Sequence, residues 1–85
     1  MQIIYTPKSK DDLDYWLKTG NKPILRKIVK LTQEIAKDPF EGVGKPEPLK
    51  HELTGYWSRR INKEHRYVYA MANETLIIVS LRGHY

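Results

Sequence analysis

The segment from Lys45 to Arg66 contains charged side chains of the kinds that bind or transform phosphate esters. Glu47 lies between Pro46 and Pro48, and proline restricts both its own φ and the conformation of the residue before it. A carboxylate on so stiff a stretch has little backbone freedom left to lose, so Glu47 is suited to the role of a fixed general base. The alternative is a solvated loop glutamate, which is the more frequent case for this residue type.

Basic residues follow Glu47 along the chain, and the ones of interest are Lys50, Arg59, Arg60 and Arg66. Guanidinium groups bind phosphate oxygens in a two-pronged geometry. Neighbouring residues of a strand point to opposite faces, so at most one of Arg59 and Arg60 shares a face with a site, and we favour Arg60. Solvent-facing charge, or an ion pair with Glu52 or Glu64, is the alternative reading of these cations.

The histidines are His51, His65 and His84, and no two of them have the spacing of a helical metal site. We therefore predict no metal and no other cofactor. His84 is followed only by Tyr85, and chain ends usually fray. The apolar run "LIIVSL" just before them predicts a firmly held strand, which can order the residues that follow it. An imidazole there is suited to proton exchange near neutral pH.

A carboxylate, guanidinium groups and an imidazole are together the set that cleaves RNA without a metal. A base takes the proton of a ribose 2′-hydroxyl, whose oxygen then attacks the neighbouring phosphorus. Cations stabilise the charged phosphorane, and an acid protonates the departing 5′-oxygen. Aromatic residues in the same region can stack on bases. We expect Trp57 and one of Tyr67 and Tyr69 to be in the core instead.

Length and composition limit the protein class. The 85 residues are enough for one compact domain, residues 1–85, with a modest core, so a site should be a surface groove. Fifteen Lys and Arg face ten Asp and Glu, and the net charge of +5 favours nucleic acid or an acidic protein as partner. Without cysteine, disulfides and thiolate metal sites are excluded. Neither a secretory leader nor a membrane span is recognisable, so we predict a cytoplasmic protein without membrane association.

The elements that must position these residues follow from apolar periodicity and turn signals. Thr6 and Asn21 are predicted to cap two helices, which end near Gly20 and Asp38. The proline- and glycine-rich stretch 39–48 is a predicted loop. The predicted strands are 2–5, 49–53, 56–62, 65–72 and 75–82, the last being central and covered on both faces. The prediction is an α+β fold of order β-α-α-β-β-β-β, with an antiparallel sheet and both helices on one face.

The segment "DPFEGVGKPEPLKHELTGYWSRRINKEHRYVYA" and the terminal "HY" resemble the YoeB/Txe toxins of the RelE superfamily of bacterial toxin–antitoxin systems. The pattern PFEG.GKPEPLKH.L.G.WSRRI..EHR.VY carries this resemblance, which extends over essentially the whole chain. It implies the microbial-ribonuclease-like α+β fold. It also implies a ribosome-dependent endoribonuclease that cleaves messenger RNA in the ribosomal A site and is inhibited by a cognate antitoxin of the YefM/Axe type. Members of the family can form homodimers.

The resemblance also implies roles for individual residues. Glu47 matches the general base, Arg66 the phosphate-stabilising arginine and His84 the general acid. Tyr85 matches a terminal tyrosine that is important for activity. Supporting site positions are matched by Lys50, Arg60 and Glu64, of which Glu64 is expected to orient an arginine.

Two other functions remain open at this point. The ParE branch of the superfamily resembles this scaffold in fold but poisons DNA gyrase, so a non-catalytic protein inhibitor is one alternative. The full set of Glu47, Arg66, His84 and Tyr85 argues against it, since a gyrase inhibitor does not need them. The other alternative is a simple RNA-binding module that uses charge and stacking aromatics.

Overall fold

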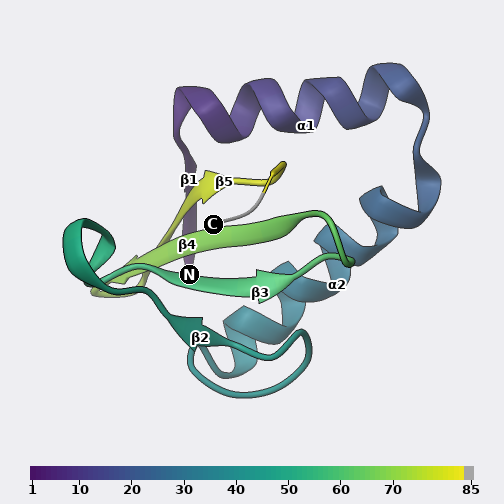
Figure 1. Ribbon diagram of the computed structural model, residues 1–85. Coiled ribbons are helices and arrows are strands. Elements are labelled where there is room, and N and C mark those ends of the chain that lie inside the picture. The colour runs from purple at the N-terminus through teal and green to yellow at the C-terminus, as the bar shows by residue number, and fades with distance from the viewer. Residues whose placement is uncertain (84–85) are drawn as a thin grey trace.

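The computed structural model describes residues 1–83 and has the predicted α+β architecture (Figure 1). His84 and Tyr85 lie outside the described residues. The elements are β1 (Gln2–Tyr5), α1 (Pro7–Thr19), α2 (Lys22–Lys37), β2 (Glu47–Pro48), a 3₁₀ turn (His51–Leu53), β3 (Trp57–Arg60), β4 (Arg66–Ala72) and β5 (Thr75–Ser80). Among the described residues, no helix is both long and apolar enough to cross a membrane.

Both helices begin and end where the local sequence predicts. The Thr6 hydroxyl accepts a 3.2 Å hydrogen bond from the Ser9 amide and so caps α1, and Gly20 ends that helix in the left-handed conformation. The Asn21 side chain caps α2 in the same way. The chain leaves α2 at Asp38 in an extended conformation, as expected of a residue that precedes proline.

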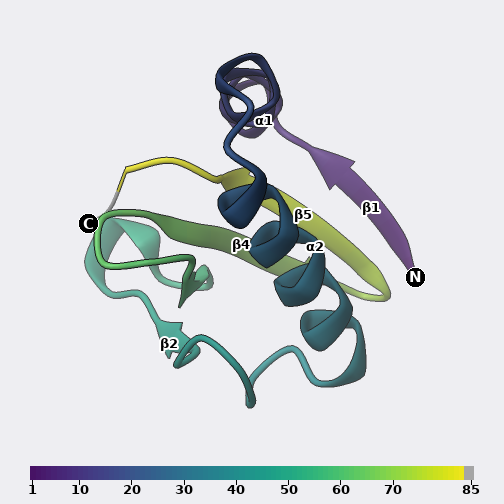
Figure 2. The same ribbon diagram turned by 90° about the vertical axis from the view of Figure 1, so that its right-hand side faces the viewer.

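The five strands form one sheet of order β1-β5-β4-β3-β2 (Figure 2). The last four strands pair antiparallel, as predicted. The first strand, β1, adds to β5 in parallel, so the sheet is mixed rather than wholly antiparallel. Because β2 begins at the end of the sheet at which β1 finished, the three antiparallel pairings that follow leave β5 running in the same direction as β1.

The prediction that the last strand is central and covered on both faces was correct about its place in the sheet and wrong about its cover. β5 is an interior strand that lies between β4 and β1. Along β5 the burial alternates, with Leu76, Ile78 and Ser80 buried and the residues between them only half-buried. The continuous apolar run therefore reflects one covered face and one partly covered face.

The predicted strand 49–53 was also wrong. Strand β2 lies earlier, at Glu47–Pro48, and residues His51–Leu53 form a 3₁₀ turn. His51 has a φ of 58°, which breaks any strand at this point. Pro48 can be part of β2 because β2 is at the edge of the sheet, where a missing N–H is tolerated. The predicted strand 2–5 matches β1, and the predicted strands 56–62, 65–72 and 75–82 are longer than β3, β4 and β5 by three, one and two residues.

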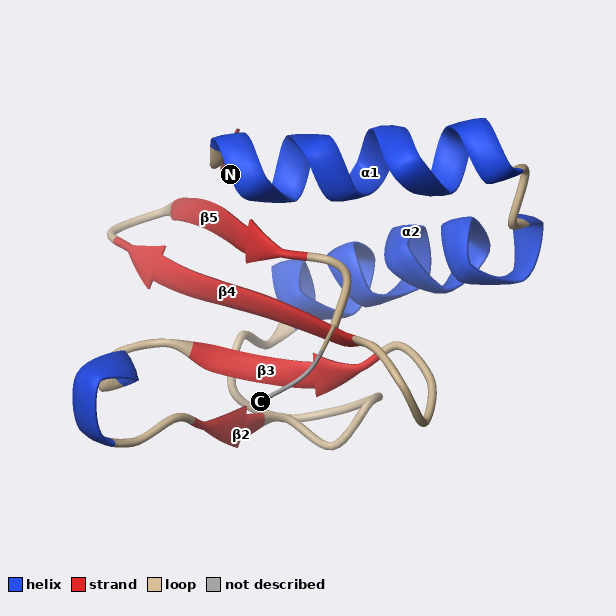
Figure 3. Ribbon diagram, turned by 45° about the horizontal axis from the view of Figure 1, so that its top comes forward, coloured by secondary structure: helices blue, strands red, loops and turns tan. Residues whose placement is uncertain are grey.

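The core lies between the sheet and α2, which runs across one face of the strands (Figure 3). One stripe of α2 supplies Ile24, Ile28, Leu31 and Ile35, and α1 supplies Trp16. Tyr67 and Tyr69 of β4 are both fully buried against this stripe, whereas Trp57 is only partly buried. Both tyrosines are therefore in the core, although the sequence predicted only one of them there.

Candidate active site

The strand register places Glu47 and two arginines on the sheet face that points away from α2. Glu47 is paired with Ser58, and Arg60 is paired with Arg66. Directly paired residues point to the same side, as do residues two apart in one strand, so these four share one face. The opposite face, which includes Arg59 and the core tyrosines, lies against α2 and its following loop. Arg59 is buried and Arg60 is exposed, so these neighbours point to opposite faces, as predicted.

Arg60 and Arg66 are an unusual cross-strand pair. Two cations directly opposite each other repel, and such pairs are destabilising in an antiparallel ladder. Within residues 1–83 neither arginine forms an ion pair with Glu52 or Glu64, nor with any other carboxylate. Two arginines paired across neighbouring strands, with no carboxylate of the described residues beside them, are suited to bind an anion such as phosphate.

A surface hollow of about 510 Å³ lies where the end of β3 meets the loop before β2 and the side of α2. Five of its lining residues are cationic: Lys27, Lys45, Arg60, Lys63 and Arg66. No Asp or Glu of residues 1–83 is among the lining residues. The described part of the chain therefore leaves the positive charge of the hollow without a carboxylate to offset it, and an anionic ligand would do so.

Buried Arg59 fixes the loop that leads to Glu47. Its guanidinium donates to the backbone oxygens of Asp38, Glu41 and Val43 at 2.6, 3.0 and 3.1 Å and to the Tyr69 hydroxyl at 3.1 Å. Arg59 is fully buried, and all of these acceptors are uncharged. Gly44 completes the packing, because a Cβ at this position would lie only 3.0 Å from both the Arg59 Cβ and a Leu31 methyl. The loop thus enters β2 from a fixed starting point.

Two buried phenols adjoin this loop anchor. Burial raises the pKa of Tyr67 well above that of a free phenol. Burial also raises the pKa of Tyr69, although the hydrogen bond from Arg59 offsets part of the effect. Both side chains therefore remain neutral at physiological pH, and Tyr69 donates to the Pro39 carbonyl.

The remaining predicted site residues are more scattered. Lys50 is exposed at the start of the 3₁₀ turn, and Glu64 is exposed in the β3–β4 hairpin. Glu47, Lys50 and Glu64 do not line the hollow that contains the two arginines. The predicted residues His84 and Tyr85 cannot be placed, since they lie outside the described residues. Among residues 1–83, no three His, Asp or Glu side chains are grouped so that they could hold a metal ion.

Sequence reasoning missed three lysines of the hollow and the role of Arg59. Lys27 lies on the polar side of an amphipathic helix, and its type and spacing do not distinguish it from its exposed neighbours. Lys45 and Lys63 lie in turns whose direction the sequence does not specify. The one usable signal was the alternation of Arg59 and Arg60, which requires one of the two to point toward the core.

Comparison with known proteins identifies the family. Residues 5–85 match the family described as "YoeB-like toxin of bacterial type II toxin-antitoxin system". Toxin YoeB of Escherichia coli K12 is 51% identical over 85 residues, all of both chains. The structure of a YoeB/ParE toxin from Agrobacterium tumefaciens matches all of both chains with a TM-score of 0.94 and 41% identity. YoeB of Staphylococcus aureus, solved as a dimer and in complex with YefM, is 41% and 42% identical, with TM-scores of 0.91 and 0.90, and the match covers 100% of this chain and 98% of that one. The chain therefore belongs to the YoeB-like toxin family of bacterial type II toxin–antitoxin systems.

Proposed function

We propose that this toxin is an endoribonuclease that cleaves messenger RNA in the ribosomal A site and thereby stops translation. The observation that carries the proposal is the cationic pair Arg60 and Arg66, which shares one sheet face with Glu47 in a member of the YoeB-like family. A phosphodiester beside this pair would relieve the repulsion between the guanidinium groups. The nearby carboxylate would supply a base on the same face.

The proposed reaction needs no metal. Glu47 removes the proton of a ribose 2′-hydroxyl, and the freed oxygen attacks the adjacent phosphorus, with departure of the 5′-oxygen. Arg66, with Arg60 and Lys50 in support, stabilises the negative charge of the phosphorane. His84 protonates the departing oxygen, and Tyr85 contacts the substrate beside it. General acid and base groups typically contribute about 10²–10⁴-fold each.

The other supporting residue is Glu64, which lies in the hairpin just before Arg66. In the proposed site it orients an arginine rather than contacting RNA. A negative charge near the guanidinium pair would weaken phosphate binding if it were free to move inward. Its place in the exposed turn, where its backbone amide donates to Asn62, is compatible with a role at the margin of the site.

A protein partner is part of the proposal. A YoeB–YefM complex exists for the Staphylococcus aureus relative, and we infer that an antitoxin of the YefM/Axe type binds and inhibits this toxin. Self-association into a homodimer is inferred in the same way. A surface suited to a partner is the free edge of β1, where Ile3, Ile4 and Tyr5 are exposed. A protein that acts on ribosomes works in the cytoplasm.

The deciding experiment adds purified toxin to a translation reaction and maps messenger 5′ ends by primer extension. We expect new ends within A-site codons, only when ribosomes are present, and their loss when antitoxin is added first. Arrested translation with intact messenger would overturn the nuclease proposal and favour a non-catalytic inhibitor. Cleavage of the same messenger without ribosomes would overturn only the ribosome dependence.

A further inference from the structure

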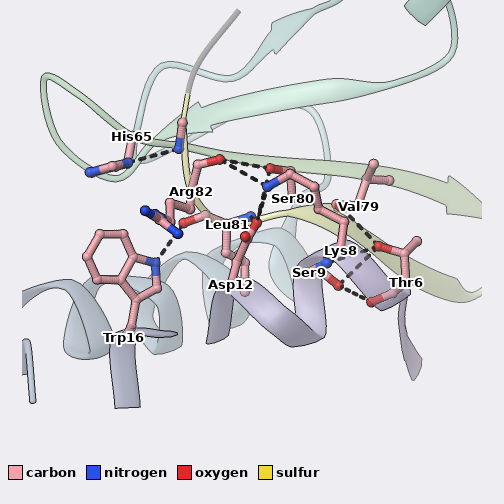
Figure 4. Close-up of polar contacts among 11 residues, drawn as sticks. Thr6, Lys8, Ser9, Asp12, Trp16, His65, Val79, Ser80, Leu81 and Arg82 are labelled. Carbon is pink, nitrogen blue, oxygen red and sulfur yellow. Dashed lines mark hydrogen bonds and ion pairs between the residues drawn. The ribbon is translucent and has the colours of Figure 1, made fainter. Parts of the chain in front are cut away.

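Hydrogen bonds from α1 hold the last residue of β5 and the residue that follows it (Figure 4). The buried Asp12 carboxylate accepts hydrogen bonds from the Leu81 amide at 3.0 Å and from the Ser80 hydroxyl at 3.3 Å. The Trp16 indole N–H donates to the Leu81 carbonyl at 2.9 Å. Figure 4 shows both side chains pointing from α1 toward the end of the strand. The direction of the chain is thus fixed as far as Leu81.

A second attachment acts at Gly83, the last described residue. Its amide donates a 2.9 Å hydrogen bond to Nδ1 of His65, and its carbonyl accepts a 2.8 Å hydrogen bond from the Arg66 amide. Both backbone groups of Gly83 are therefore bound by two consecutive residues at the start of β4. The residue that precedes His84 is joined to the strand that carries Arg66.

The bond to His65 requires one form of its ring. Nδ1 must carry a lone pair, so the imidazole is neutral and its proton is on Nε2. The half-buried ring is held in this orientation by an edge-to-face contact with Trp16, with a centroid separation of 4.8 Å. Trp16 is thus shared between the attachment at Leu81 and the attachment at Gly83.

We propose that His65 is a positioning residue: its Nδ1 holds the Gly83 amide and so sets the direction in which the chain enters His84. The proposal rests on the proposed function, in which His84 is the general acid. His84 directly follows Gly83 in the chain, so the placement of a proton donor there depends on how Gly83 is held. His65 acts through Gly83 and does not itself touch the substrate.

Two substitutions distinguish the effect of the hydrogen bond to Gly83 from the effect of the packing of the His65 ring. In His65→Asn the side-chain oxygen is bonded to Cγ, as Nδ1 is, and can still accept from Gly83. In His65→Gln the amide lies further along the side chain, near the place of Nε2, and leaves the Gly83 amide without its acceptor. Both lose the contact with Trp16, so a difference between them reports on the bond alone. His51→Gln is the matched control, since His51 is exposed on the 3₁₀ turn.

The readout is single-turnover cleavage on ribosomes programmed with messenger, at saturating and limiting toxin. We expect His65→Gln to lower the maximal rate about 10²-fold, the effect of a misplacement of about 1 Å. Its half-saturating concentration should change little, because ribosome binding does not involve the bond. His65→Asn should recover most of the rate, and His51→Gln should match the wild type. An equal loss in the Asn and Gln variants, or no loss in either, would overturn the proposal.

Amide exchange provides a second readout that does not depend on activity. In His65→Gln the Gly83 amide should exchange faster, while the Leu81 amide, bound to Asp12, should stay protected. The Asn variant should protect both amides. If the wild type cleaves no messenger, the proposed function fails. Amide exchange alone then decides whether His65 holds Gly83. Equal exchange of the Gly83 amide in all variants would overturn the proposed hydrogen bond to His65. Thermal unfolding identifies a variant that fails to fold. If His65→Gln does not fold, the exchange rate of the Gly83 amide in His65→Asn is compared with that in the wild type.

Discussion

The guanidinium of fully buried Arg59 donates a 3.1 Å hydrogen bond to the hydroxyl of fully buried Tyr69. Tyr69 in turn donates to the Pro39 carbonyl, so the two side chains join β3 and β4 to the loop that follows α2. A buried cation without a carboxylate partner is costly unless its donors are all satisfied. Here three loop carbonyls and the Tyr69 hydroxyl accept hydrogen bonds from Arg59, so the conformation of the loop and the burial of the cation depend on each other.

Replacement of Arg59 by Met should therefore be strongly destabilising. The change removes the hydrogen bonds of a charged group to the Asp38, Glu41 and Val43 carbonyls and to the Tyr69 hydroxyl, and hydrogen bonds to charged groups contribute about 1.5–3 kcal/mol each. We expect the free energy of unfolding to fall by about 3 kcal/mol or more, measured by urea denaturation. The exposed neighbour is the control: Arg60→Met should stay within about 0.5 kcal/mol of the wild type. Similar values for both variants would contradict the assigned role of Arg59.

Alkaline pH should destabilise the fold through its buried phenols. Burial raises the pKa of Tyr67 and of Tyr69, so the folded state keeps their protons at pH values where the unfolded state has lost them. The folded state then binds more protons, and stability falls as pH rises above about 10, the ordinary tyrosine pKa. Thermal unfolding followed from neutral to alkaline pH should show this decline. Tyr67→Phe should make the decline shallower, and an unchanged slope would exclude Tyr67 as a cause.

Much of the fold was predictable because its signals are local. Thr6, Gly20 and Asn21 act through their own backbone neighbourhood, and the α2 stripe is a periodic pattern. The failures have a different origin. The parallel addition of β1 to β5 is decided by packing between segments far apart in the chain, which no local pattern specifies. The positive φ of His51 is likewise not specified by the residue type alone, although histidine adopts such a φ more often than most residues.

The candidate site was predictable only in part, for the same reason. The alternation rule alone assigned Arg59 and Arg60 to opposite faces. The cross-strand pairing of Arg60 with Arg66 required the register, which a hairpin turn of unknown geometry did not provide. Lys27 comes to the hollow through the position of α2 against the sheet, a tertiary relationship that no motif encodes.

Glu47→Gln tests the general base directly. The substitution keeps the shape of the side chain but removes its ability to take a proton, so the maximal cleavage rate should fall about 10²–10⁴-fold. Binding to ribosomes should persist, because Glu47 contributes no positive charge to RNA attraction. Glu41→Gln is a matched control, as it is another exposed acid of the same loop region. Single-turnover cleavage and ribosome pelleting measure the two quantities, and a near-normal rate for Glu47→Gln would refute its role.

The lysines of the hollow should contribute to RNA affinity and to its salt dependence. Lys27 and Lys63 line the hollow beside Arg60 and Arg66, and RNA phosphates bound there would release counterions. For Lys27→Gln combined with Lys63→Gln, we expect weaker ribosome binding at low salt. The slope of log affinity against log salt should become shallower by about 0.7 for each phosphate that the variant no longer neutralises.

The matched control for the lysine pair is a variant with two exposed lysines replaced, Lys10→Gln and Lys30→Gln, which has the same net charge but leaves the hollow intact. If attraction depended only on net charge, both double variants would shift the affinity and the slope equally. If the hollow contacts phosphates, the Lys27 and Lys63 pair must shift them more, since screening weakens distant charges over about 10 Å at 0.1 M salt. Binding measured across a salt series therefore separates local contact from general attraction, and equal slopes for the two variants would contradict a phosphate site in the hollow.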